Sequence, residues 1–226
     1  MSDRLMYHPA DESLLAYAAG TLDEATSVLI ATHLSLCPHC RAAVSAAESV
    51  GGEYLDRVEP SAAMKVSAAD VLAMAEQGGE VARPAAPQAC EIVADIADMA
   101  DMPRPLRNYI SDVGIKLKWR WMGPGVRYAQ IAGDDASEKI GLLRIAPGTR
   151  LPRHGHTDEE YTMVLAGSYE SASCRYRRGD VEWADAAVVH QPSAGREQEC
   201  VCLVVTRGAL KATGLFAPII QPLMAI

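Results

Sequence analysis

The chain has few aromatic side chains, no long apolar run and little positive charge in its first third. Only 5% of its 226 residues are aromatic, although apolar residues make up 49%, which is enough to build real cores. No stretch reaches about 18 consecutive uncharged apolar residues, so a membrane-spanning helix is excluded. The first four residues, Met-Ser-Asp-Arg, lack the apolar segment of a secretion signal. We therefore expect a globular, cytoplasmic protein without a membrane partner, in one large domain or two small ones.

Basic residues are scarce in residues 1–80, which hold four Lys or Arg against twelve Asp or Glu. This difference accounts for the whole net charge of −8, so residues 81–226 carry balanced charge. An acidic surface repels nucleic-acid phosphates and complements a basic protein partner, although a merely solvated face would have the same composition. The charge thus argues against direct nucleic-acid binding in this segment.

The run His-Leu-Ser-Leu-Cys-Pro-His-Cys brings His33, Cys37 and Cys40 within eight residues. Residues four apart lie on one face of a helix, and a Cys-x-x-Cys turn lets two thiolates bind one tetrahedral zinc ion. A structural zinc site has four ligands, so a fourth is needed, and His8 and His39 are the candidates. His39 stands between the cysteines and should point away, whereas His8 can fold back onto the ion. The alternatives are a redox-active cysteine pair or free cysteines that fill a core.

The first third reads as helices. Start and stop signals predict helices over residues 11–19, 22–36, 38 to about 56 and 67–77, with Gly20, Thr21 and Ser67 as end residues. The second helix is apolar on several sides, so we expect one face to be available to a partner.

The composition then changes twice. Residues 78–88 are rich in Gly, Ala and Pro and predict a linker, and residues 91–102 are compatible with a short helix that Pro103 and Pro105 end. Beyond Leu106, short apolar runs separated by Gly and Pro predict the strands of a sandwich or barrel. Six cysteines at irregular spacing favour metal or redox roles over a disulfide framework.

A second set of potential metal ligands lies in the β-rich half. His154, His156 and Glu160 all have even position numbers. Because side chains alternate between the two faces of a strand, they would share one side of a β ribbon. His190 would supply a fourth ligand from an adjacent strand. Three imidazoles and one carboxylate bind a borderline divalent ion such as zinc, iron, manganese or nickel, and the residue types do not choose among them.

Both halves resemble known families. Gly148 through Gly167 is similar to the first cupin motif, and Gly179 through His190 resembles the second, with departures at Asp185, Ala187 and Ser193. The N-terminal ligand set, His8 included, resembles the zinc-binding anti-sigma domain. The combination of the two resembles the ChrR family of anti-sigma factors over essentially the full chain.

This resemblance implies a fold and a function. The fold is a small N-terminal zinc-binding helical bundle plus a C-terminal cupin β-barrel, or jelly roll. Its expected domains are residues 1–80, a linker over 81–105 and a cupin domain over 106–226. The helical domain would sequester a group IV (ECF-type) sigma factor. The cupin domain would carry a second zinc or other divalent metal and release the sigma factor under singlet oxygen or related oxidative stress.

Alternatives remain for the cupin half. A metal-dependent enzyme, such as a dioxygenase or isomerase, would need a polar pocket, and Arg144, Arg153, Tyr161 and Arg175 could line one; we expect no enzyme. A sensor of metal level is a third reading. Two cysteines, Cys200 and Cys202, share one strand face and are either oxidisable sensor residues or small core residues.

Overall fold

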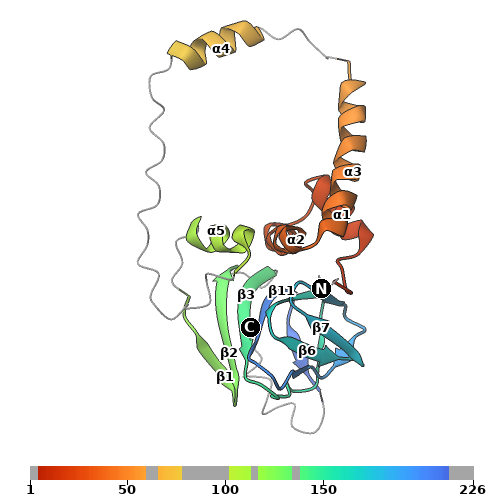
Figure 1. Ribbon diagram of the computed structural model, residues 1–226, viewed down its shortest axis with the longest axis vertical. Coiled ribbons are helices and arrows are strands. Elements are labelled where there is room, and N and C mark those ends of the chain that lie inside the picture. The colour runs from red at the N-terminus through yellow and green to blue at the C-terminus, as the bar shows by residue number, and fades with distance from the viewer. Residues whose placement is uncertain (1–4, 60–65, 78–101, 113–116, 134–137, 214–226) are drawn as a thin grey trace.

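The computed structural model describes residues 5–59, 66–77, 102–112, 117–133 and 138–213 (Figure 1). Its helices are α1 (Asp11–Ala18), α2 (Glu24–Leu36), α3 (Pro38–Asp56), α4 (Ala68–Gln77) and α5 (Arg104–Asp112). Its strands are β1 (Arg120–Gly123), β2 (Val126–Ala132), β3 (Glu138–Ile145), β4 (His154–His156), β5 (Glu160–Ala166), β6 (Ser168–Ser171), β7 (Cys174–Arg177), β8 (Val181–Ala184), β9 (Val189–His190), β10 (Ser193–Ala194), β11 (Cys200–Arg207) and β12 (Leu210–Ala212). The predicted linker over 78–88 and most of the helix predicted over 91–102 lie outside the described residues.

The helix ends follow capping chemistry, with one correction. Gly20 follows α1 with a φ of 67°, as predicted for a helix-ending glycine. The predicted cap of α2, Thr21, is wrong, because the Oδ1 atom of Asp23 accepts the Thr26 N–H at 2.7 Å. The hydroxyl of Thr21 instead donates to the Ala16 carbonyl at 3.2 Å, so it belongs to the preceding turn.

The start of α4 agrees with the sequence pattern, and the start of α5 departs from it. Ser67 caps α4 reciprocally with Asp70, since each side chain accepts the backbone N–H of the other. The prolines at 103 and 105, in contrast, begin a helix. Pro105 lies in the first turn of α5, where its missing N–H costs nothing, and Arg107 N–H donates to the Pro103 carbonyl at 3.1 Å.

Antiparallel strands form one sheet of six strands, in the order β1-β2-β3-β11-β5-β8, and two sheets of three, β10-β6-β7 and β12-β4-β9. Side chains alternate along β11, so the sheet has two apolar faces. Cys200, Cys202 and Val204 pack in the interior of the β-rich half, whereas Leu203 and Val205 belong to a separate core.

That separate core joins the two halves of the chain. α2 lies across the outer face of the six-stranded sheet, beside α5 (Figure 1). Leu29 and Ile30 of α2 are fully buried in one cluster with Leu106, Leu203 and other sheet and helix side chains. The apolar face of α2 is therefore covered within the chain, which corrects the expectation that it is available to a partner.

The exposed apolar residues lie elsewhere. α3 extends away from the sheets, and α4 lies apart from the other described elements (Figure 1). On α3, Tyr54 and Leu55 are 70% and 73% exposed, and on α4, Leu72 and Met74 are 65% and 67% exposed. No helix within the described ranges has the length and apolar character needed to cross a membrane.

Candidate metal centres

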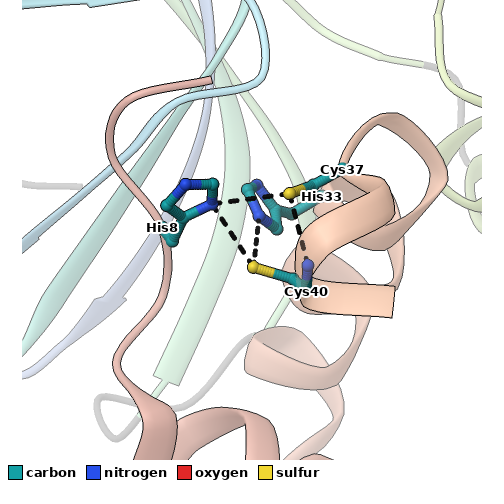
Figure 2. Close-up of side chains that lie close together, drawn as sticks. All are labelled: His8, His33, Cys37 and Cys40. Carbon is teal, nitrogen blue, oxygen red and sulfur yellow. Dashed lines mark hydrogen bonds between the residues drawn. The ribbon is translucent and has the colours of Figure 1, made fainter. Parts of the chain in front are cut away.

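His8, His33, Cys37 and Cys40 come together at the junction of α2 and α3 (Figure 2). Cys37 lies between the two helices, at the end of α2. Its Sγ atom accepts the Cys40 N–H at 3.4 Å, so the residue at the helix junction also provides a potential metal ligand. His33 comes from the last turn of α2, Cys40 from the first turn of α3, and His8 from the segment before α1. The four potential ligand atoms lie within 4.8 Å of one another.

The spacing of these atoms fits a tetrahedral zinc ion. The His8 Nδ1 atom lies 3.4 Å from Cys37 Sγ and 3.3 Å from Cys40 Sγ, and His33 Nε2 lies 3.3 Å from Cys40 Sγ. Ordinary Zn–N and Zn–S bonds give an N···S edge of about 3.5 Å in a tetrahedron. His39 is exposed and outside the cluster, as its position between the cysteines predicts.

Electrostatics at this cluster also suit a cation. Burial lowers the pKa of His33, so its ring is neutral and its Nε2 atom can bind a metal. Burial, followed by the interaction with Cys37, raises the pKa of the Cys40 thiol to about 12. A thiolate at this position therefore needs a positive charge beside it, which zinc supplies.

The second predicted set, His154, His156, Glu160 and His190, also comes together, and all four residues are buried. β4 pairs with β9, and His154 lies directly opposite His190. The His190 Nε2 atom lies 3.1 Å from His154 Nε2 and 3.2 Å from His156 Nε2, so three ring nitrogens converge on one point. These separations match two nitrogens at about 2.0–2.1 Å from one ion.

The electrostatics of this donor set suit a divalent ion. Burial lowers the pKa of His154 and of His156 to about 4, which keeps both rings neutral, and burial raises the pKa of Glu160 to about 7. A buried carboxylate among neutral imidazoles gains from a cation that would stabilise its charged form. Three imidazoles and a carboxylate fit a borderline metal without selecting one.

Sequence reasoning missed the groups that orient these ligands. Glu182 on β8 lies with its Oε1 atom 3.4 Å from His190 Nδ1, and its Oε2 atom accepts the Tyr169 hydroxyl at 2.8 Å. Burial alone would raise the pKa of Glu182, but contacts with His190, Ser171 and Tyr169 outweigh it and the pKa is lowered. From sequence alone, an acid such as Glu182 is expected to face solvent, because its partners are known only once the strands are paired.

A mostly apolar cavity of about 340 Å³ adjoins the second cluster. Its walls include Val126, Leu143, Ile145 and Val204, with His154 and Glu160 at one side. The polar residues expected of an enzyme pocket do not line it. Arg144 instead binds Glu199, and Tyr161 contacts Ser13 of α1. Arg153 and Arg175 also lie outside the cavity wall.

The cysteine pair of β11 lies inside the fold. Cys200 and Cys202 are buried, their sulfurs are 3.6 Å apart, and Cys202 lines the cavity. Hydrogen bonding with Cys200 and burial raise the pKa of the Cys202 thiol well above its ordinary value. Because the thiolate is the reactive form, this environment favours the core reading of the pair over that of an oxidisable sensor.

Known proteins share both parts of this arrangement. Residues 9–41 match the family described as a putative zinc-finger, and residues 114–210 match the family described as a ChrR cupin-like domain. The anti-sigma-E factor ChrR of Cereibacter sphaeroides is 36% identical over 223 residues, covering 98% of this chain and 99% of that protein.

Solved structures give the same result. The crystal structure of Rhodobacter sphaeroides SigE in complex with the anti-sigma ChrR matches with a TM-score of 0.72 at 36% identity, covering 89% of this chain and 99% of that chain. An RmlC-like cupin protein from Ralstonia eutropha matches 44% of this chain and 68% of its own at 20% identity, with a TM-score of 0.41 that is too low for functional argument.

The expected pairing of a zinc-binding helical region with a cupin fold is confirmed by these similarities. The full-length relative is named as an anti-sigma factor, in agreement with the expectation that this chain is not an enzyme. The chain belongs to the ChrR family of anti-sigma factors.

Proposed function

We propose that this chain is a cytoplasmic anti-sigma factor that sequesters an ECF-type sigma factor and releases it in response to singlet oxygen or related oxidative stress. The observation that carries the proposal is similarity along nearly the whole chain to an anti-sigma factor. The helical half would hold the sigma factor, and the cupin half would sense the stress. No direct contact with nucleic acid is part of this function.

Both metal clusters have separate roles in the proposal. Zinc at His8, His33, Cys37 and Cys40 would be structural, because so small a helical half depends on its metal to fix the corner between α2 and α3. Zinc or another divalent metal at His154, His156, Glu160 and His190 would be the sensing site.

The sigma factor would bind the projecting part of α3 together with α4. These helices carry several exposed apolar residues, and their charged residues in the described ranges are mostly acidic: Glu48, Glu53, Asp56, Asp70 and Glu76. A sigma factor presents basic surfaces to DNA, so negative charge steers association while apolar side chains supply affinity. The covered face of α2 has no part in this contact.

Capture of a co-expressed ECF sigma factor tests the binding surface. Leu55→Asp and Leu72→Asp should each weaken capture about 100-fold, since each loses about 1.5–3 kcal/mol of apolar burial and introduces a charge. Trp121→Ser is the matched control, because Trp121 is 62% exposed on the cupin half and should leave capture unchanged. Full capture by both aspartate variants would overturn the proposed surface.

The same assay can also measure release of the sigma factor from the complex. His156→Ala should bind the sigma factor normally and fail to release it when the complex is exposed to singlet oxygen. Equal release from the wild-type and variant complexes would contradict a sensing role for the second cluster.

A further inference from the structure

A single strand contacts both clusters. The turn before β8 provides the Gly179 carbonyl, which accepts the His33 Nδ1–H at 2.8 Å and leaves Nε2 free to face Cys40. Asp180 Oδ1 accepts the backbone N–H groups of Met6 at 2.8 Å and Tyr7 at 3.2 Å, directly before His8. Residues of the cupin half therefore position two ligands of the first cluster.

The same strand positions a ligand of the second cluster. Glu182 lies two residues beyond Asp180 and contacts His190 Nδ1, which Ser171 also contacts at 2.9 Å. Gly179 and Glu182 are three residues apart, a span of about 10 Å in an extended strand. We call residues Gly179–Glu182 the bridging segment.

The bridging segment is held firmly in place. The Asp180 Oδ2 atom accepts the Arg177 N–H at 2.9 Å, and the Val181 N–H donates to the Tyr7 carbonyl at 3.1 Å. At Gly179, φ is 95°, and an added Cβ would lie 2.6 Å from a Leu5 methyl carbon, so the N-terminal segment packs directly on the turn. A displacement of this strand must move the residues around His8 and His33.

Stacked aromatic rings make a second connection between the same groups. Tyr7 contacts Tyr176 with ring centroids 4.5 Å apart, and Tyr176 stacks on Tyr169 at 5.0 Å. The Tyr169 hydroxyl donates to Glu182, so the residue next to His8 is linked to the carboxylate that contacts His190. Both connections end on the bridging segment.

We propose that the bridging segment couples the two metal sites, so that loss of the metal held by His190 weakens zinc binding at Cys37 and Cys40. Without that metal, the buried histidines and Glu160 lose their shared cation and His190 no longer fixes Glu182. The carbonyl of Gly179 and the carboxylate of Asp180 then hold His33 and His8 less well. The inference rests on the proposed metal sites and is independent of sigma binding.

Cobalt titration of the full chain measures the effect, because the thiolate-to-cobalt absorption reports the Cys37 and Cys40 site alone. His190→Ala should weaken cobalt binding at that site about tenfold. Linkage requires the reverse effect to be equal, so a variant with Cys37→Ser and Cys40→Ser should bind the cupin metal about tenfold more weakly. Glu182→Gln, which keeps every ligand, should shift cobalt binding in the same direction.

Two backgrounds locate the coupling in the bridging segment. In an Asp180→Asn background, His190→Ala should have less than about a threefold further effect. Arg207→Ala is the matched control, since Arg207 joins Asp23, the N-cap of α2, to Glu159 of the cupin half without touching the bridging segment. There the tenfold effect should persist, and its loss would show that general docking of the halves carries the coupling.

The remaining outcomes separate this inference from the proposed function. Two bound ions in the wild-type chain with unchanged cobalt affinity in both His190→Ala and Glu182→Gln would overturn the coupling alone. A single bound ion in the wild-type chain would overturn the second metal site and the coupling with it. Sigma capture by the same preparations reports separately on the binding function.

Discussion

Replacing Leu29 by alanine tests whether α2 is docked on the cupin sheet. Leu29 is fully buried in the core shared by α2, α5 and the six-stranded sheet. A buried Leu→Ala substitution lowers the free energy of unfolding by about 2–5 kcal/mol through lost transfer energy and the remaining cavity. For a chain of this size, about 3 kcal/mol lowers Tm by roughly 6–12 °C.

Two spectroscopic signals distinguish the halves. All three tryptophans, Trp119, Trp121 and Trp183, lie in the cupin half, whereas the far-UV helical signal comes mainly from the first third. Because the core is shared, Leu29→Ala should lower the transition temperature of both signals together. A shift of the helical signal alone would refute the docking, because the cupin half would then unfold independently of α2.

A matched substitution supplies the control. Leu55→Ala changes the same residue type on α3, where the side chain is 73% exposed, so it should change stability by less than about 0.5 kcal/mol. Its effect should appear in sigma capture instead. Leu29 is thus expected to affect stability, whereas Leu55 is expected to affect sigma-factor binding.

Two predictions concern metal and pH. A variant with Cys37→Ser and Cys40→Ser should retain one metal equivalent where the wild-type chain has two, as measured by atomic absorption; an unchanged content would contradict the first site. Burial, and then Asp23, raise the pKa of Glu138 from 4.5 to about 7, so its protonated form is favoured in the folded state and its contribution to stability, present below about pH 4.5, is lost as pH rises towards 7. Glu138→Gln should therefore raise Tm relative to wild type more at pH 8 than at pH 5, and a difference independent of pH would disagree with this assignment.

The ligand clusters could be predicted from sequence because their residue types are rare and their spacing is constrained. Cys37 and Cys40 lie close together because one helix junction holds both, as their spacing predicts. His154 and Glu160 also lie close together, but strand alternation alone does not explain it. β4 and β5 belong to different sheets, and the chain turns at residues 157–159 between them, so alternation along one strand does not relate the two residues.

The covering of α2 could not be predicted, because an apolar surface does not specify what packs on it. Leu29 and Ile30 would be equally compatible with a partner protein or with the cupin sheet. The sequence does not indicate α5 clearly, because Pro103 and Pro105 are as compatible with the end of a preceding helix as with the start of a new one. The spacing of Leu106, Tyr109 and Ile110 was the available signal, since residues three and four apart form one helix face.

Contacts that orient ligands were also beyond sequence reasoning. Asp180 just before β8 and Glu182 within it have no distinctive sequence pattern around them. The partners of Asp180 are 173 and 174 residues away in the chain. Long-range pairing of this kind has no local pattern to reveal it.

The carbonyl of Gly179 has a practical consequence for chimeric proteins. A hybrid that joins this helical half to a cupin from another protein would keep all four candidate zinc ligands in its own sequence. It would nevertheless lack the backbone acceptor that fixes the tautomer of His33, and the acid that anchors the segment before His8, unless the new cupin supplied both. Modules that look interchangeable in sequence would have to be exchanged together with the turn that precedes β8.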